Sequence, residues 1–136
     1  MFLPMDKKIA FWNLVVDAKS MLDDMFDSLE KIVNVVESGS YAKHPLNSPA
    51  IALVREVRDG EHGQLLRALR TKFHDIYARL QAAKGDDAAV FKLILEVGAL
   101  LPGIAKLDEQ MDEMHKTMDE LHKTIEQRIK AFVERN

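Results

Sequence analysis

The sequence predicts an all-α protein, an antiparallel helical bundle of three to four long helices plus shorter pieces. Apolar residues recur at helical spacing along most of the chain, and no segment shows the period-two alternation of a half-buried strand. Proline and glycine are concentrated at a few points, which divide the chain into rods. At 136 residues, we interpret positions 1–136 as a single helical-bundle domain.

The first rod is predicted over residues 6–37, with Asp6 as its N-cap. At 1.5 Å per residue this helix is roughly 48 Å long. Its apolar stripe is broad, as expected for a helix that packs against two neighbours. The stripe consists of Trp12, Leu22, Met25, Phe26, Leu29, Ile32, Val33 and Val36. Ser38-Gly39-Ser40 is predicted to end the helix, and a loop with two prolines follows.

The middle of the chain is predicted to form two helices in succession. A short helix covers residues 49–58 and begins after Ser48, a capping hydroxyl followed by proline at the first helical position. Asp59-Gly60 interrupts this pattern, and a longer helix follows over residues 61–84. Gly85 is predicted to end the longer helix.

The last third is predicted to form one long, interrupted helix, with Asp86 as its cap. Apolar residues repeat every seven positions from Val90 to Ile125. Pro102-Gly103 falls inside this repeat, and a proline ring clashes with the carbonyl four residues earlier. Because the repeat keeps its phase, we predict a kink or break near Pro102, at residues 101–103, with little loop.

Residues 111–124 contain nearly the same heptad twice, MDEMHKT and MDELHKT. After residue 104 the apolar stripe narrows to two positions per heptad, which is typical of a coiled coil. We therefore expect residues 104–134 to extend as a coiled-coil-like helix. The partner-binding residues predicted on it are Met111, Met114, Met118 and Leu121; with Ile125 we call them the seam.

Three roles for the seam remain open: packing within the chain, self-association as a homodimer, or binding of a different protein. Methionine is flexible and packs against varied surfaces, which suits an adaptable contact. Arg128 interrupts the seam, so the strict repeat lasts about three heptads.

The histidines of this repeat do not predict a metal site. Asp112 and His115, like Asp119 and His122, are three positions apart and offer two ligands each. His115 and His122 lie about 10.5 Å apart along the helix axis, too far to share one ion. We therefore predict no metal and no cofactor.

A second pattern, R-x-x-R-x-x-x-H, occurs in the basic third of the chain. Residues 38–85 carry eight basic and four acidic side chains, and both flanking segments are acidic. Arg67, Arg70 and His74 fall within about 60° of one another on a helix. Such a stripe binds a phosphate group, or it forms ion pairs with acids of neighbouring helices.

The spacing from Arg67 to His74, and from Arg55 to His62, resembles the R-x(4–6)-H motif of HEPN-type ribonucleases. HEPN-type ribonucleases are small dimeric all-α proteins. Because they are ribonucleases, the resemblance implies binding and cleavage of RNA. The match covers eight residues, and Ala68 follows Arg67 where the family often has asparagine.

Composition narrows the class of protein. Apolar residues make up 47% and charged residues 30% of a chain without cysteine, which suits a globular protein in a reducing compartment. No apolar run approaches the ~20 residues of a membrane span, and MFLPMDKK reverses the charge order of a signal peptide. We expect a cytoplasmic protein that binds no membrane.

The predicted function is that of a non-enzymatic helical interaction module that self-associates through its Met-rich C-terminal helix. The alternative is an anion-binding or nucleic-acid-binding protein, including a HEPN-like ribonuclease, that uses Arg67, Arg70 and His74.

Overall fold

The computed structural model of the chain describes residues 2–38 and 48–135. These residues form helices and no strand, which confirms the predicted all-α fold class. The helices are α1 (Met5–Val36), α3 (Ser48–Asp59), α4 (Glu61–Ala83), α5 (Asp87–Ala99) and α6 (Leu101–Arg135).

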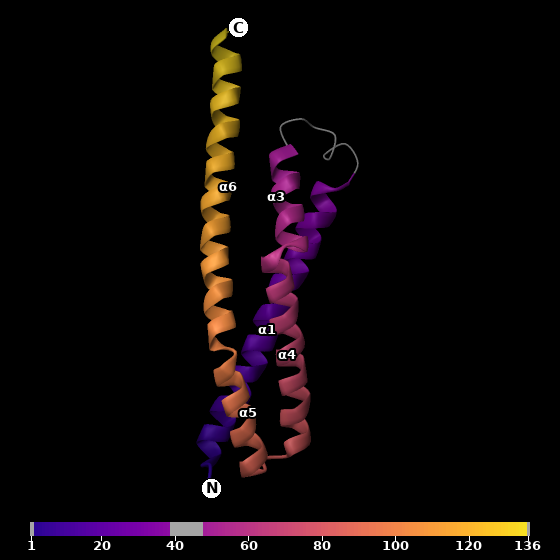
Figure 1. Ribbon diagram of the computed structural model, residues 1–136, viewed down its shortest axis with the longest axis vertical. Coiled ribbons are helices and arrows are strands. Elements are labelled where there is room, and N and C mark those ends of the chain that lie inside the picture. The colour runs from indigo at the N-terminus through magenta and orange to yellow at the C-terminus, as the bar shows by residue number, and fades with distance from the viewer. Residues whose placement is uncertain (1, 39–47, 136) are drawn as a thin grey trace.

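The helices form three antiparallel rods (Figure 1). Helix α1 is the first rod, α3 and α4 run in line back toward the N-terminal end, and α5 and α6 form the third rod. Helix α4 is the central element, because it contacts α1, α5 and α6. Helix α6 continues past the start of α3, and the chain ends at its tip (Figure 1).

The hydrophobic core lies in the half of the bundle where α1, α4 and α5 run together. Its most enclosed side chains are Val15 from α1, Leu66 and Phe73 from α4, and Val90 from α5. The other buried members are Phe11, Leu22, Leu69, Ile76, Leu80, Leu93, Val97 and Leu107. Among the residues that the structure describes, α6 therefore contributes to the core only through its first turns.

The start of α1 differs from the prediction. The helix begins at Met5, and Pro4 rather than Asp6 occupies the N-cap position without a side-chain cap. The carbonyl oxygen of Pro4 accepts hydrogen bonds from the backbone N–H groups of Lys7 and Lys8, so helical bonding starts earlier. Asp6 lies in the first turn, where its charge still complements the helix dipole.

The predicted break between α3 and α4 is confirmed at Gly60. The two helices approach so closely there that a Cβ atom at Gly63 would lie 2.1 Å from the carbonyl oxygen of Arg58. A Cβ at Gly60 would lie 2.4 Å from the carbonyl oxygen of Glu56. Both positions therefore require glycine for the close backbone contact rather than for an unusual backbone angle.

The turn between α4 and α5 follows the predicted chemistry. Lys84 and Gly85 have positive φ angles of 48° and 79°, which ends α4. The Asp86 side chain then caps α5, because Ala89 N donates a hydrogen bond to Asp86 Oδ2 at 3.0 Å. The ammonium group of Lys8 on α1 donates to the carbonyl oxygen of Gly85 at 2.8 Å and so fixes this turn to the first rod.

The predicted break near Pro102 is confirmed, one residue before the expected range. Leu100 separates α5 from α6, and α6 begins at Leu101. Pro102 falls in the first turn of α6, where its missing N–H breaks no helical hydrogen bond. The two helices therefore remain almost in line (Figure 1).

Candidate interaction surface

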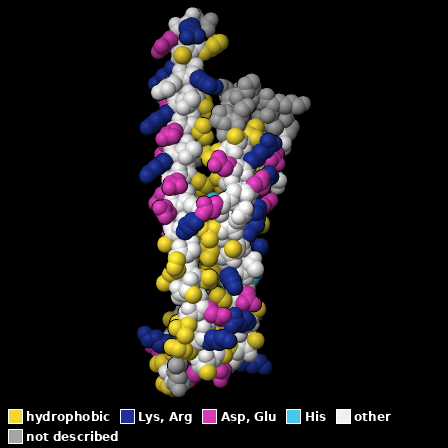
Figure 2. Space-filling view, in the orientation of Figure 1, with side chains coloured by type: hydrophobic (Ala, Val, Ile, Leu, Met, Phe, Trp, Pro, Cys, Tyr) yellow, Lys and Arg dark blue, Asp and Glu magenta, His cyan; other side chains and the backbone are white. Residues whose placement is uncertain are grey.

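An apolar groove of about 490 Å³ lies between α1, α3 and α6. In Figure 2 hydrophobic side chains line a hollow between α6 and the α3–α4 rod. The apolar lining consists of Met25, Leu29, Ile32, Leu53, Val54, Val57, Leu66, Met111 and Met114. The polar lining consists of Asp24, Ser28, His62 and His115. This surface suits an apolar ligand of considerable size.

Two of the four predicted partner-binding residues line this groove. Met111 and Met114 are half-buried, and they share the groove with Met25 of α1. Leu121 lies farther along α6 and is also half-buried. The side chain of Met118 lies outside the described residues. The structure therefore brings the first part of the seam together with α1 and α3.

Helix α6 is fixed to α4 just below the groove. His62 Nδ1 and Gln110 Oε1 lie 3.2 Å apart, and Lys106 forms an ion pair with Glu61. Leu107 is 4% exposed and belongs to the core. Between Leu107 and Met111 the apolar stripe of α6 therefore passes from the closed core into the open groove.

Beyond the groove the apolar side of α6 becomes exposed. Ile129 and Val133 are 51% and 65% exposed, and Phe132 is 71% exposed. Figure 1 shows this end of α6 reaching past α3. The apolar side of α6 thus extends from the groove through Leu121 and Ile125 to Ile129 and Val133, with Arg128 as an interruption.

The positions that flank the seam carry no Lys, Arg, Asp or Glu through the repeated heptads. They are filled by His115, Thr117, His122 and Thr124. Thr117 Oγ1 donates to the Glu113 carbonyl oxygen and Thr124 Oγ1 to the Glu120 carbonyl oxygen, each at 3.0 Å. Both hydroxyls are thus satisfied within α6 and need no external partner.

With these flanks the charge-free arc covers about 180° of the helix at 100° per residue. That is wider than a two-stranded coiled-coil contact requires and suits a helix with two neighbours. The sequence of the repeat already shows these uncharged flanking positions, but the prediction considered only the seam positions.

The structure brings Arg70 and His74 together on a carboxylate of α1. Arg70 Nε and His74 Nε2 each lie 2.7 Å from Asp23 Oδ1. Partial burial raises the pKa of Asp23, but hydrogen bonds from His74 and Arg70 and the charges of His74 and Lys19 lower it by more. The pKa of Asp23 therefore lies below its ordinary value, and the carboxylate remains charged at neutral pH.

The other arginines of the two R-x-x-R-x-x-x-H patterns lie apart from this cluster. Arg67 is exposed on α4. Arg55 Nε donates to Glu37 Oε1 at 3.0 Å, whereas His62 faces Gln110. Arg55 and His62 therefore do not share a partner, and the two copies of the pattern have different surroundings.

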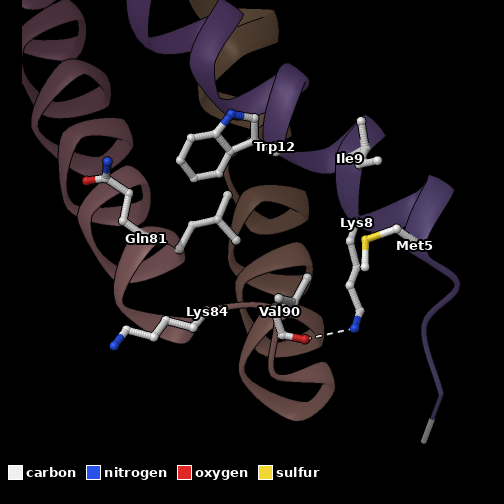
Figure 3. Close-up of a pocket in the computed structure, with 9 residues that line it drawn as sticks. Met5, Lys8, Ile9, Trp12, Gln81, Lys84 and Val90 are labelled. Atoms are coloured by element: carbon white, nitrogen blue, oxygen red, sulfur yellow. Dashed lines mark hydrogen bonds between the residues drawn. The ribbon is translucent and has the colours of Figure 1, made fainter.

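A second cavity, of about 550 Å³, lies at the opposite end of the bundle between α1, α4 and α5 (Figure 3). Its wall includes Trp12, whose ring centroid lies 5.4 Å from that of Tyr77. The Lys8 amine, which also lines the cavity, is bound by the carboxylate of Asp87 and by the carbonyl oxygen of Gly85 (Figure 3). Lys84 also lines this cavity, and its side chain extends outward in Figure 3.

Metal-ligating side chains do not gather in the part of the chain that the structure describes: no group of three or more His, Asp or Glu could hold an ion. The pairs Asp112–His115 and Asp119–His122 are exposed on α6.

One segment, Asp87–Arg135, passes a length-and-composition test for a membrane-crossing helix, with an 18-residue window of mean hydropathy 1.8. The sequence expectation did not anticipate this. Mostly buried core helices of soluble proteins pass the same test. In this window 11% of the residues are buried, and α5 places Val90, Leu93 and Val97 in the core.

Comparison of the chain with protein-family models, with curated proteins and with solved structures finds no match.

Proposed function

We propose that the protein is a non-enzymatic helical interaction module that self-associates through α6. The observation that carries this proposal is the apolar groove between α1, α3 and α6, which continues into the exposed apolar side of the C-terminal half of α6. Contiguous exposed apolar surface of this kind is typical of protein-binding sites.

The chemistry of the groove favours a helix as its ligand. A groove with apolar walls binds the apolar face of an amphipathic helix, whose polar face remains in water. Met25, Met111 and Met114 line it, and methionine adapts its shape to the side chains that it meets. The lining of the groove therefore supports the binding of a helix.

The alternative, an anion-binding or ribonuclease function, has less support from the geometry. The carboxylate of Asp23 already lies between Arg70 and His74, in the position that a phosphate would take. A phosphate would have to displace that carboxylate and then face its negative charge at short range.

The mass of the protein in solution, measured by light scattering over a range of concentrations, tests the proposal. We expect a species of twice the 15.5 kDa chain mass. Met114→Asp places a charge in the groove and should shift this species toward the monomer while circular dichroism retains its helical signal. Lys116→Asp adds the same side chain on the charged side of α6 and should leave the dimer intact.

A monomer at every concentration would overturn self-association. The alternative has its own readout, which is salt-sensitive binding of RNA that weakens in Arg67→Ala and Arg70→Ala. RNA binding of that kind by a monomeric wild type would replace the proposal with the anion-binding function.

A further inference from the structure

We infer that the occupant of the groove is the C-terminal half of α6 from a second copy of this chain, running antiparallel to α6 and related by a two-fold axis near Leu121. This inference rests on the proposed self-association and adds the surface, the orientation and the register. Each copy would insert its helix end into the groove of the other.

The two surfaces that need a partner lie on one face of one helix. Met111 and Met114 face the groove, and Ile129 and Val133 continue the same side of α6 into solvent. A hetero-partner confined to the groove would leave the exposed end uncovered. A second copy covers both, because its own exposed end fills the groove while its groove receives the first chain's end.

The apolar side of α6, from Met111 to Val133, extends about equally far on both sides of Leu121. Met111 lies ten residues before Leu121, about 15 Å along the axis, and Ala131 lies the same distance after it. An axis close to Leu121 therefore sets Ile129 of one copy against Met114 of the other. The last turns of α6, with Val133, then reach the groove.

The residues that flank the seam near the axis are uncharged. A helix lying in the groove contacts α6 along one edge and α1 with α3 along the other. Near the axis, residues 115, 117, 122 and 124 bring no Lys, Arg, Asp or Glu into the contact. At the inserted end, Glu126 and Arg128 border the apolar arc of Ile129 and Val133. The hydroxyls of Thr117 and Thr124 are already bonded to their own backbone, so their burial costs little.

A parallel pairing lacks these advantages. It would set each seam residue against itself, Met114 against Met114 and Ile129 against Ile129. The exposed ends would then cover each other, and both grooves would stay open to water. The antiparallel arrangement removes more apolar surface from water for the same length of helix.

Cysteine cross-linking distinguishes the two orientations, and the wild-type chain contains no cysteine to interfere. We expect Leu121→Cys to cross-link with itself, because residues near the axis meet their own copies. Met114→Cys and Ile129→Cys should remain uncross-linked alone and should form a covalent dimer when the two variants are mixed. Lys116→Cys, on the charged side of α6, is the matched control and should not cross-link.

Dissociation of the dimer gives a second readout. Ile129→Asp and Met114→Asp lie 15 positions apart, about 22 Å on one helix, yet both should raise the dissociation constant by about tenfold or more. Ile129 is exposed in the single chain, so its substitution should leave the unfolding midpoint of dilute, monomeric protein unchanged.

The experiments distinguish a failure of this inference from a failure of the proposed function. Self-linking of Met114→Cys would show a parallel pair and overturn the inference while the proposed function stands. A wild-type dimer whose α6 cysteines never cross-link would overturn the inference in the same way and would direct attention to the exposed Leu95 and Leu101. A monomeric wild type would overturn both.

Discussion

Asp23 on α1 and His74 on α4 lie 51 positions apart in the sequence, and their side chains meet at 2.7 Å between Oδ1 and Nε2. Because a carboxylate can only accept, the imidazole donates this hydrogen bond. Arg70 donates to the same oxygen, also at 2.7 Å, and its guanidinium lies 4.6 Å from the ring centre of Phe26. One carboxylate thus connects the first two rods of the bundle.

Asp23→Asn should destabilise the protein by about 1–2 kcal/mol, because charge-assisted hydrogen bonds to two partners are weakened together. Urea unfolding at neutral pH measures this loss. Asp27→Asn removes a charge one turn away, at an exposed position, and should change the free energy of unfolding by less than about 0.5 kcal/mol. Equal effects of the two substitutions would contradict a specific role for Asp23.

The contribution of Asp23 should depend on pH in a defined direction. Its pKa is lowered from 3.8 in the folded protein, so the stabilisation is fully present above that value and is lost as pH falls through the lowered pKa. The difference in unfolding free energy between wild type and Asp23→Asn should therefore shrink in strong acid. Other carboxylates titrate in both proteins, so the difference isolates Asp23. A difference that grew on acidification would refute this sign.

Two glycine substitutions should act in opposite directions. Gly63→Ala brings a Cβ within 2.1 Å of the Arg58 carbonyl oxygen and forces α3 away from α4, so the melting temperature should fall. Gly98→Ala meets nothing within 4 Å and lies inside α5, so it should stabilise by about 0.5–1 kcal/mol. Thermal unfolding of both variants is the measurement, and a tolerated alanine at position 63 would argue against the tight α3–α4 junction.

Substitution of a buried and of an exposed phenylalanine should have very different effects on the free energy of unfolding. Phe73 is 1% exposed at the centre of the bundle, so Phe73→Ala should cost about 3–5 kcal/mol. Phe2 is 80% exposed, and Phe2→Ala should leave the unfolding midpoint nearly unchanged. Chemical denaturation compares the two. A small effect at Phe73 would mean that the core lies elsewhere.

Most of the fold could be predicted because helix boundaries are local. Gly60, Gly85, Asp86 and Pro102 act on their immediate backbone, and each marks a boundary in the structure within a residue or two. Asp6 was the exception. Its prediction as a cap was wrong because Pro4, which lacks an N–H but offers a carbonyl, accepts the first helical bonds itself.

The candidate surface was predictable only in part. The narrow stripe predicted that the last helix contacts fewer neighbours than a core helix and left the role of the seam open. In the structure Met111 and Met114 line a groove. The opposite wall of that groove, from Met25 to Ile32 on α1 and from Leu53 to Val57 on α3, lies far away in the sequence. Its pairing with α6 depends on how the rods cross, which periodicity does not specify.

By itself the sequence determined the helices, their limits and the apolar face of each, because these depend on spacing and on the backbone chemistry of neighbouring residues. Only the tertiary structure decided which faces meet. In the tertiary structure Arg70 and His74 bind Asp23, and Leu107 is the last described residue of α6 in the buried core. Met111 and Met114 line an open groove. Those contacts join residues that are distant in the chain. Many side chains of similar polarity could make them, and only the packed arrangement selects which ones do.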